Sequence, residues 1–280
     1  MLIFDTDNNI MSAIPRMLAL KLPEIDVIRY ITPETGEEKC IKATEVAAIA
    51  ATGGLIKLGI VYETGGADET SGAGRAAGSF AVQYMTNVLR APKNAVIWYT
   101  QDRDATATQM PGIKAAFAAF KAQLNGMYRL GCYGSGYCCD ALKAAELIAL
   151  IWLTDSVGFS GSRASVAAKR YDMLQHLPLA QWGLDTDPDL AIEAGGADLG
   201  FFVPAVTPPA SVEARSAPDV AWLQVKLILA GHAVAVDGVW GPQTAEAVAA
   251  YQAASACLAG NGTADARAMA TLNGASVNVA

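Results

Sequence analysis

Short apolar runs alternate with alanine-rich amphipathic segments over residues 1–200, and this alternation limits the folds that the chain can adopt. Strands that alternate with helices form parallel sheets with crossover helices, and eight such repeats favour a closed (β/α)8 TIM-like barrel. The segments 158–170 and beyond 190 lack clear helical periodicity, so an irregular or open barrel is the alternative. The strand-like runs are 2–5, 26–30, 56–62, 95–100, 126–133, 148–154, 171–175 and 182–185, and the helical segments are 44–51, 72–89, 109–124 and 137–146.

The composition changes between residues 195 and 218, which are rich in Gly, Pro, Ala and Ser. Such a composition is typical of a linker. The predicted organisation is therefore a barrel over 1–200, a linker over 201–218 and a small domain over 219–275. Apolar residues at helical spacing predict three helices in that small all-α domain, and they include Trp222, Leu223, Leu227, Ala247, Val248, Tyr251 and Leu272.

The charge balance limits the partners of the chain. Lys and Arg number 20 against 27 Asp and Glu, a net charge of -7, so the basic surface of nucleic-acid-binding or anionic-lipid-binding proteins is not expected. The first residues contain no basic segment before their apolar run, and the longest later apolar stretch, 147–153, is too short to cross a membrane. We expect no signal peptide, no membrane insertion and a monomer that stays in the cytoplasm where it is made.

The shortage of histidine limits the chemistry. The chain has two histidines, His176 and His232, in different predicted domains, which argues against a histidine-ligated zinc hydrolase. Five scattered cysteines indicate neither a disulfide framework nor a recognisable nucleophile motif. We therefore expect no metal and no cofactor.

Polar and charged residues recur at the carboxyl ends of the predicted strands, where barrel enzymes place their active sites. With carboxylates abundant there, the simplest reaction is acid/base cleavage of a glycosidic bond by paired carboxyl groups. Asp5, Glu63 and Asp102 are the predicted catalytic residues. Asp155 follows the sixth strand, and the predicted substrate-binding residues are Arg29, Tyr133, Trp152, Gln175 and Asp185.

The motifs around these residues resemble a known family. In order, FDTD at Asp5, VYE at Glu63, IWYTQDRD at Asp102, LGCYGSG at Tyr133 and GLDTD at Asp185 are similar to the glycoside-hydrolase-like barrel related to family 25 lysozymes. The resemblance implies a muramidase with an aspartate after the first strand and an Asp-x-Glu on the fourth, whose glutamate donates the proton. Here that tripeptide is Thr100-Gln101-Asp102, so the first acid is replaced and the implied donor is Asp102.

The small domain resembles the peptidoglycan-binding domain of bacterial and phage cell-wall hydrolases. The resemblance rests on LQ at Leu223, VDGVWGPQT over 236–244 and YQ at Tyr251. It implies peptidoglycan as the partner and Asp237, Gly238, Trp240 and Thr244 as binding residues.

Together the two resemblances imply a lysozyme-like peptidoglycan hydrolase, most similar to a phage endolysin that waits in the host cytoplasm until it is released to the wall. Two alternatives stay open. One is a non-catalytic peptidoglycan-binding protein whose barrel lost its acid pair, and the other is an antibacterial effector hydrolase.

Overall fold

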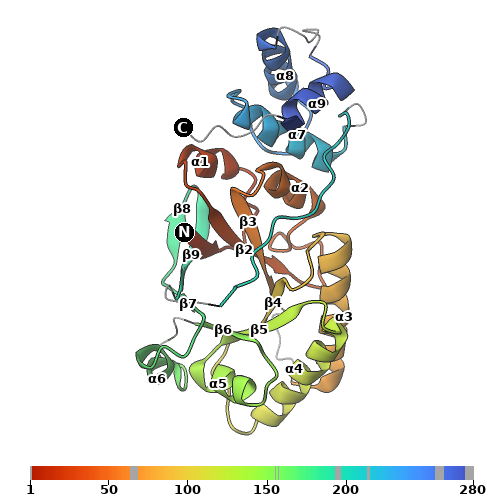
Figure 1. The fold of residues 1–280 in the computed structure, drawn as a ribbon. Helices are drawn as coiled ribbons and strands as arrows, with labels where there is room; N and C mark the ends of the chain where they lie inside the picture. Colours follow the sequence, from red (N-terminus) through yellow and green to blue (C-terminus); the bar gives the residue numbers. More distant parts are fainter. Residues whose placement is uncertain are drawn as a thin grey trace.

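The fold consists of a barrel wrapped by helices and a small helical domain that packs on one side of it (Figure 1). The structure, a computed structural model, describes residues 2–63, 69–154, 156, 158–192, 197–212, 215–255 and 262–274. Two positions named in the predictions lie outside the described residues: Asp155, which follows the sixth predicted strand, and residue 275, the predicted end of the small domain.

Seven strands follow one another around the barrel in sequence order, each parallel to the next. This confirms the predicted barrel. The strands are β1 (Leu2–Asp5), β2 (Ile25–Ile31), β3 (Ile56–Tyr62), β4 (Val96–Gln101), β5 (Arg129–Gly134), β6 (Leu150–Leu153) and β7 (Met173–Gln175). The helices between them are α1 (Ile14–Ala19), α2 (Ala43–Ala51), α3 (Ser71–Asn87), α4 (Met110–Leu124), α5 (Gly136–Ala144) and the short α6 (Ser162–Ala167).

The eighth position is filled by β9 (Leu184–Ala191), which is antiparallel to β7 on one side and to β1 on the other. The expectation that every strand is parallel is wrong here, because a hairpin and not a crossover helix precedes β9. Its first arm is β8 (Leu179–Gln181), and its turn holds Trp182 and Gly183, both at positive φ. Two consecutive residues with positive φ are typical of a tight hairpin turn.

The residues just after the barrel close its amino-terminal end. Leu199 and Phe201 pack into the cluster of apolar side chains inside the barrel. Gly59 makes room for them, since a Cβ at that position would lie 2.6 Å from the Phe201 ring. Phe202 then exchanges backbone hydrogen bonds of 2.8 and 3.0 Å with Leu58. The start of the Gly- and Pro-rich segment is thus part of the packed barrel.

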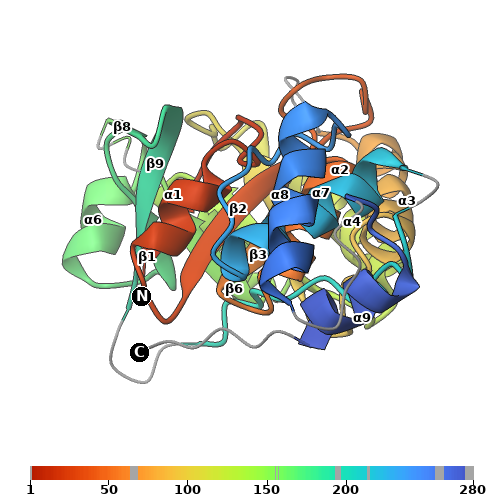
Figure 2. The same cartoon turned by 90° about the horizontal axis from the view of Figure 1, so that it is seen from above.

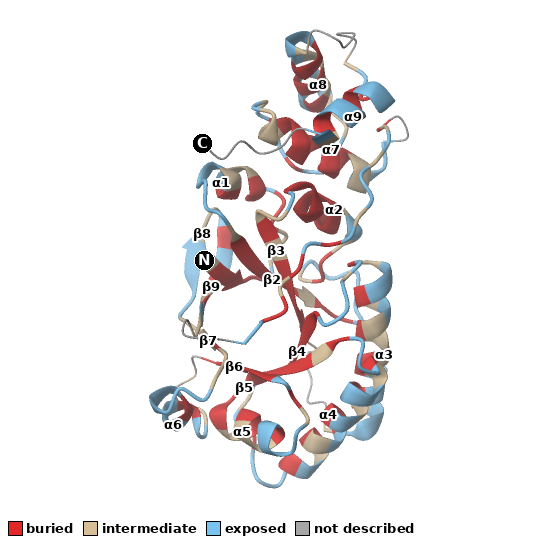
Figure 3. Ribbon diagram, in the orientation of Figure 1, coloured by how far each residue is buried: buried red, intermediate tan, exposed pale blue. Residues whose placement is uncertain are grey.

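The small domain consists of α7 (Ala217–Leu229), α8 (Pro242–Ala254) and α9 (Ala266–Gly274), which confirms the predicted helical domain. Its helix α7 packs on α2 of the barrel, and α8 and α9 lie beyond it (Figure 2). As a result, α2 is buried along almost its whole length (Figure 3). Val46 and Ile49 of α2 and Leu223 of α7 belong to one continuous apolar cluster. The two domains therefore share one hydrophobic core.

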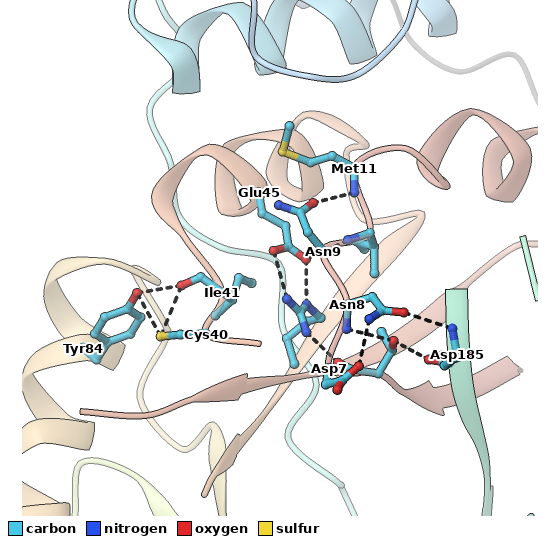
Figure 4. A network of polar contacts seen from close by, with 12 residues as sticks. Asp7, Asn8, Asn9, Met11, Cys40, Ile41, Glu45, Tyr84 and Asp185 are labelled. Atoms are coloured by element: carbon cyan, nitrogen blue, oxygen red, sulfur yellow. Dashed lines mark hydrogen bonds and ion pairs between the residues drawn. The ribbon is translucent and has the colours of Figure 1, made fainter. Parts of the chain in front are cut away.

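A fully buried ion pair fixes α2 to the barrel. Arg29 of β2 and Glu45 of α2 have no exposed side-chain surface, and their closest atoms, Nε and Oε1, lie 2.7 Å apart. Arg29 also donates to the carbonyl oxygen of Thr6, and Glu45 accepts a 3.2 Å hydrogen bond from the amide of Ile10. Figure 4 shows Glu45 at the centre of these contacts. Because the pair is hydrogen-bonded on both sides, neither charge is left uncompensated.

Replacing Glu45 by Gln should destabilise the protein strongly, since it leaves the Arg29 guanidinium buried without its counter-charge. We expect a loss of about 3 to 5 kcal/mol in the free energy of unfolding, measured by urea denaturation. The control Glu37→Gln removes an exposed carboxylate and should change the stability by about 0.5 kcal/mol or less. Equal effects of the two substitutions would contradict a structural role for the buried pair.

Candidate functional site

A small polar pocket of about 130 Å³ opens at the carboxyl ends of the barrel strands. The lining residues come from β2, β3, β4, β5, β6, β7 and β9 or directly follow those strands. In each strand they hold the positions that alternate toward the barrel interior, as the pleat of a strand requires. The pocket is lined by Tyr30, Val61, Glu63, Thr100, Asp102, Tyr133, Trp152, Gln175 and Asp187.

Two of the three predicted catalytic residues, Glu63 and Asp102, line this pocket. Glu63 accepts a 3.0 Å hydrogen bond from the Lys39 ammonium, which also gives it a counter-charge. Burial acts to lower the pKa of Lys39, but the Glu63 carboxylate outweighs it and raises that pKa. No described cation forms an ion pair with Asp102, whose side chain has exposed surface. Partial desolvation of its carboxyl, together with the charge of Glu63, raises the pKa of this group. The two carboxyl groups thus occupy different electrostatic environments.

The third predicted catalytic residue, Asp5, lies behind the pocket lining and is only 1% exposed. Its carboxylate accepts hydrogen bonds from the Tyr30 hydroxyl at 2.8 Å and from the Gln175 amide at 3.0 Å. Burial raises the pKa of Asp5 from 3.8 to about 7, with a smaller contribution from the charges of Asp187 and Glu63, although the two hydrogen bonds act to lower it. Asp5 therefore holds two lining side chains in place and changes charge near neutral pH.

Aromatic and amide side chains form the part of the pocket wall that β5, β6 and β7 contribute. The Tyr133 hydroxyl donates a 2.6 Å hydrogen bond to Gln175, and the Tyr133 ring packs edge-on against Trp152 with centroids 4.7 Å apart. The Trp152 indole donates a 2.7 Å hydrogen bond to the buried Asp189. Tyr133, Trp152 and Gln175 thus all lie at the pocket, where the sequence analysis expected them, and they are locked to one another.

Two predicted substrate-binding residues lie elsewhere. Arg29 is wrong as a pocket residue because its strand position faces outward, toward α2, where it forms the buried ion pair with Glu45. Asp185 is exposed beyond the pocket, and its backbone contacts Thr6 and Asn8, as Figure 4 shows for Asn8. Asp187, two residues further along β9, takes the place expected for Asp185.

The sequence analysis missed several residues of this site. Tyr30, Thr100 and Asp187 line the pocket but were not among the predicted site residues. Strand alternation would have found them, since Tyr30 has the inward parity that Arg29 lacks. Lys39 is different, because it lies in a loop between β2 and α2 and no periodic signal marks it.

The predicted binding residues of the small domain lie in and beside one loop, whose polar groups surround the buried side-chain amide of Gln224. Gln224 of α7 donates to Asp237 and Thr244 and accepts from the backbone amides of Asp237 and Gly238. Thr244 and Gly238 are buried, and a Cβ at Gly238 would lie 2.8 Å from the Thr44 methyl group of the barrel. These two residues shape the loop and its contact with the barrel.

Trp240 is the remaining predicted binding residue of the loop. It is half-buried, and the Arg215 guanidinium lies over its ring, 4.5 Å from the centroid. Asp237 and Trp240 are thus the two predicted binding residues that retain exposed surface.

Among the described residues, no cluster of three or more His, Cys, Asp and Glu side chains is suited to hold a metal ion. Cys40, Cys132, Cys138 and Cys139 are free thiols and are buried. No helix within the described ranges is long and apolar enough to span a membrane.

Comparison with solved structures shows the same barrel in other proteins. Rv2525c, a Tat-secreted protein of Mycobacterium tuberculosis solved in complex with L-tartrate, matches with a TM-score of 0.58 and 15% identity, over 71% of this chain and 98% of its own. An uncharacterized protein of B. stearothermophilus matches with a TM-score of 0.50 and 18% identity, over 69% of this chain and 96% of its own. At such identities the likeness concerns the fold. No curated protein sequence matches the chain.

Family profiles assign both parts of the sequence. The peptidoglycan-binding domain profile matches residues 216–272, which include α7, α8 and most of α9. The profile of the Rv2525c-like, glycoside hydrolase-like domain matches residues 21–193, which is more than half of the chain and includes the barrel from β2 to β9. The chain therefore belongs to the Rv2525c-like glycoside hydrolase-like family and carries a peptidoglycan-binding domain at its carboxyl-terminal side.

Proposed function

We propose that the protein is a peptidoglycan hydrolase of the endolysin type, which cleaves a glycosidic bond of the glycan strand in the pocket at the carboxyl ends of the strands. The observation that carries this proposal is the pair Glu63 and Asp102 in one pocket, the first paired with Lys39 and the second without a cation among the described residues. Glycosidases need two carboxyl groups whose environments separate their protonation states. The peptidoglycan-binding domain supports the cell-wall glycan as the substrate.

The environments suggest a role for each carboxyl group. Asp102, whose raised pKa favours the protonated form, is the proposed proton donor to the leaving oxygen. Glu63, which accepts a hydrogen bond from Lys39, is the proposed carboxylate that activates water or stabilises the positive charge of the transition state. Asp5 does not line the pocket and is proposed to position Tyr30 and Gln175.

Asp102→Asn should abolish hydrolysis while leaving the fold and wall binding intact, because the amide cannot donate the proton. We expect a loss of at least about 100-fold in the rate of reducing-end release from purified peptidoglycan, within the usual contribution of acid catalysis. Asp104→Asn is the matched control, since within the described residues Asp104 accepts hydrogen bonds from Ser160, outside the pocket, and the variant should keep most of the activity. Release of free amines in place of reducing ends would refute the glycosidase assignment.

The raised pKa of Asp5 predicts a particular dependence of stability on pH. The folded state keeps the proton up to about pH 7, whereas the unfolded chain loses it near 3.8, so this carboxyl stabilises the fold at low pH and the contribution falls as pH rises between these values. We expect the unfolding free energy of the wild type, relative to Asp5→Asn, to fall by more than about 1.4 kcal/mol between pH 4 and 7.5. Urea denaturation at several pH values measures this difference, and a constant difference would contradict the shift.

A second candidate function is peptidoglycan binding without catalysis. Two observations favour it: Lys39 neutralises Glu63, and the pocket of about 130 Å³ is small. In that case the wild type should co-sediment with purified peptidoglycan and release no soluble fragments over a prolonged incubation. Any release of reducing ends that Asp102→Asn abolishes would exclude this candidate.

A further inference from the structure

A second cavity, of about 390 Å³, lies at the amino-terminal end of the barrel, opposite the proposed catalytic pocket. It is larger than that pocket, and its walls combine acidic side chains with apolar ones contributed by the segment that closes the barrel. The residues that matter here are Glu24, Asp26, Lys57, Asp189, Leu199 and Phe201.

Two carboxyl groups of this cavity each have an oxygen atom to which no described group donates a hydrogen bond. Asp26 is 1% exposed and its Oδ1 accepts no hydrogen bond, and Asp189 is 4% exposed and its Oδ2 accepts none. The strand register places them on either side of Ile3, which pairs with Asp26 on β2 and with Asp189 on β9. Buried carboxyl oxygens without donors cost free energy. A donor to these oxygens would have to come from water or from another molecule bound at this wall.

Among the described residues that line this cavity, the cation Lys57 is already engaged. Lys57 forms an ion pair with Glu24, also in the wall. Asp198, a further acid in the lining, is held by Arg129. The described lining therefore has four acidic side chains, Glu24, Asp26, Asp189 and Asp198, and one cationic side chain, Lys57. Burial raises the pKa of Asp26 to about 7, and the charge of Lys57 acts to lower it, whereas no described cation acts on Asp189.

We propose that this cavity binds a small organic molecule that carries a primary ammonium group on a polar, sugar-sized skeleton. An ammonium has three donors and a positive charge, which suits two neighbouring carboxyl groups with unused oxygens. The volume lies in the range of small-molecule sites, and Leu199 and Phe201 give the carbon skeleton an apolar wall. The cavity is far larger than a bare ion needs, and the described part of the chain offers no three-ligand metal cluster. This site goes beyond the proposed hydrolysis, which uses the opposite end of the barrel.

Isothermal titration calorimetry of the full chain at pH 7.5 tests the site. The probe is D-glucosamine, and D-glucose and N-acetyl-D-glucosamine are the controls that match its ring but lack the ammonium. We expect saturable binding of glucosamine, with the two uncharged sugars at least tenfold weaker. Equal affinity for all three, or no saturable heat with glucosamine, would overturn the proposal and leave a cavity filled by water.

Variants locate the binding. Asp26→Asn should weaken glucosamine binding at least tenfold, and thermal denaturation would verify that the variant is folded. Asp189→Asn should do the same, but it also alters the hydrogen bond to Trp152, so Asp26→Asn is the primary test. Asp102→Asn, at the other end of the barrel, should leave glucosamine binding unchanged. Loss of binding in Asp102→Asn, or unchanged binding in Asp26→Asn, would place the ligand elsewhere and refute the site.

Discussion

The closure of the barrel by β9 is the constraint on which the rest of the structure depends. This strand forms backbone hydrogen bonds with β7 and β1 at once, so the sheet has no open edge between them. Because β9 is antiparallel, Asp187 lies at the pocket on the carboxyl end of the barrel. Asp189, two residues further along β9, lies at the cavity on the amino end. Gln175 and Asp5, at the ends of the two neighbouring strands, meet through this closure. The pocket exists only in the closed barrel.

The barrel interior holds an unusual share of acidic groups for a packed core. These groups lie at two levels on three adjacent strands: Asp5 pairs with Asp187 nearer the carboxyl end, and Asp26 and Asp189 both pair with Ile3 nearer the amino end. Burial raises the pKa of each, and for Asp5 and Asp26 it brings the value to about 7. Buried carboxyl groups of this kind cluster at functional sites, because they cost stability that a core without function would not lose. Asp189 also joins the two ends of the barrel, since it lines the lower cavity and holds Trp152 of the upper pocket.

The small domain is joined to the barrel by packing as well as by the chain. Helix α7 covers α2, the loop at Gly238 touches Thr44, and one apolar cluster extends through both domains. A domain of this size has a small core of its own, so the shared surface adds to the stability of both parts. The buried pair Arg29 and Glu45 lies beneath the same helix and keeps α2 in the position that α7 requires. The peptidoglycan-binding domain therefore has a defined orientation relative to the pocket.

The barrel, the helical domain and most of the pocket could be predicted from the sequence. Periodicity is a local property, and it was enough to place the first seven strands, four of the barrel helices and the pocket residues Glu63, Asp102, Tyr133, Trp152 and Gln175, whereas α1, α6, β8 and the bounds of β9 were not predicted. The tertiary structure was needed for the antiparallel direction of β9, the ion pair of Arg29 with Glu45, the contact of Lys39 with Glu63 and the role of residues 197–202 in closing the barrel. Each of these depends on which distant segment lies beside the residue, and burial and charge pairing across such contacts leave no periodic trace in the sequence.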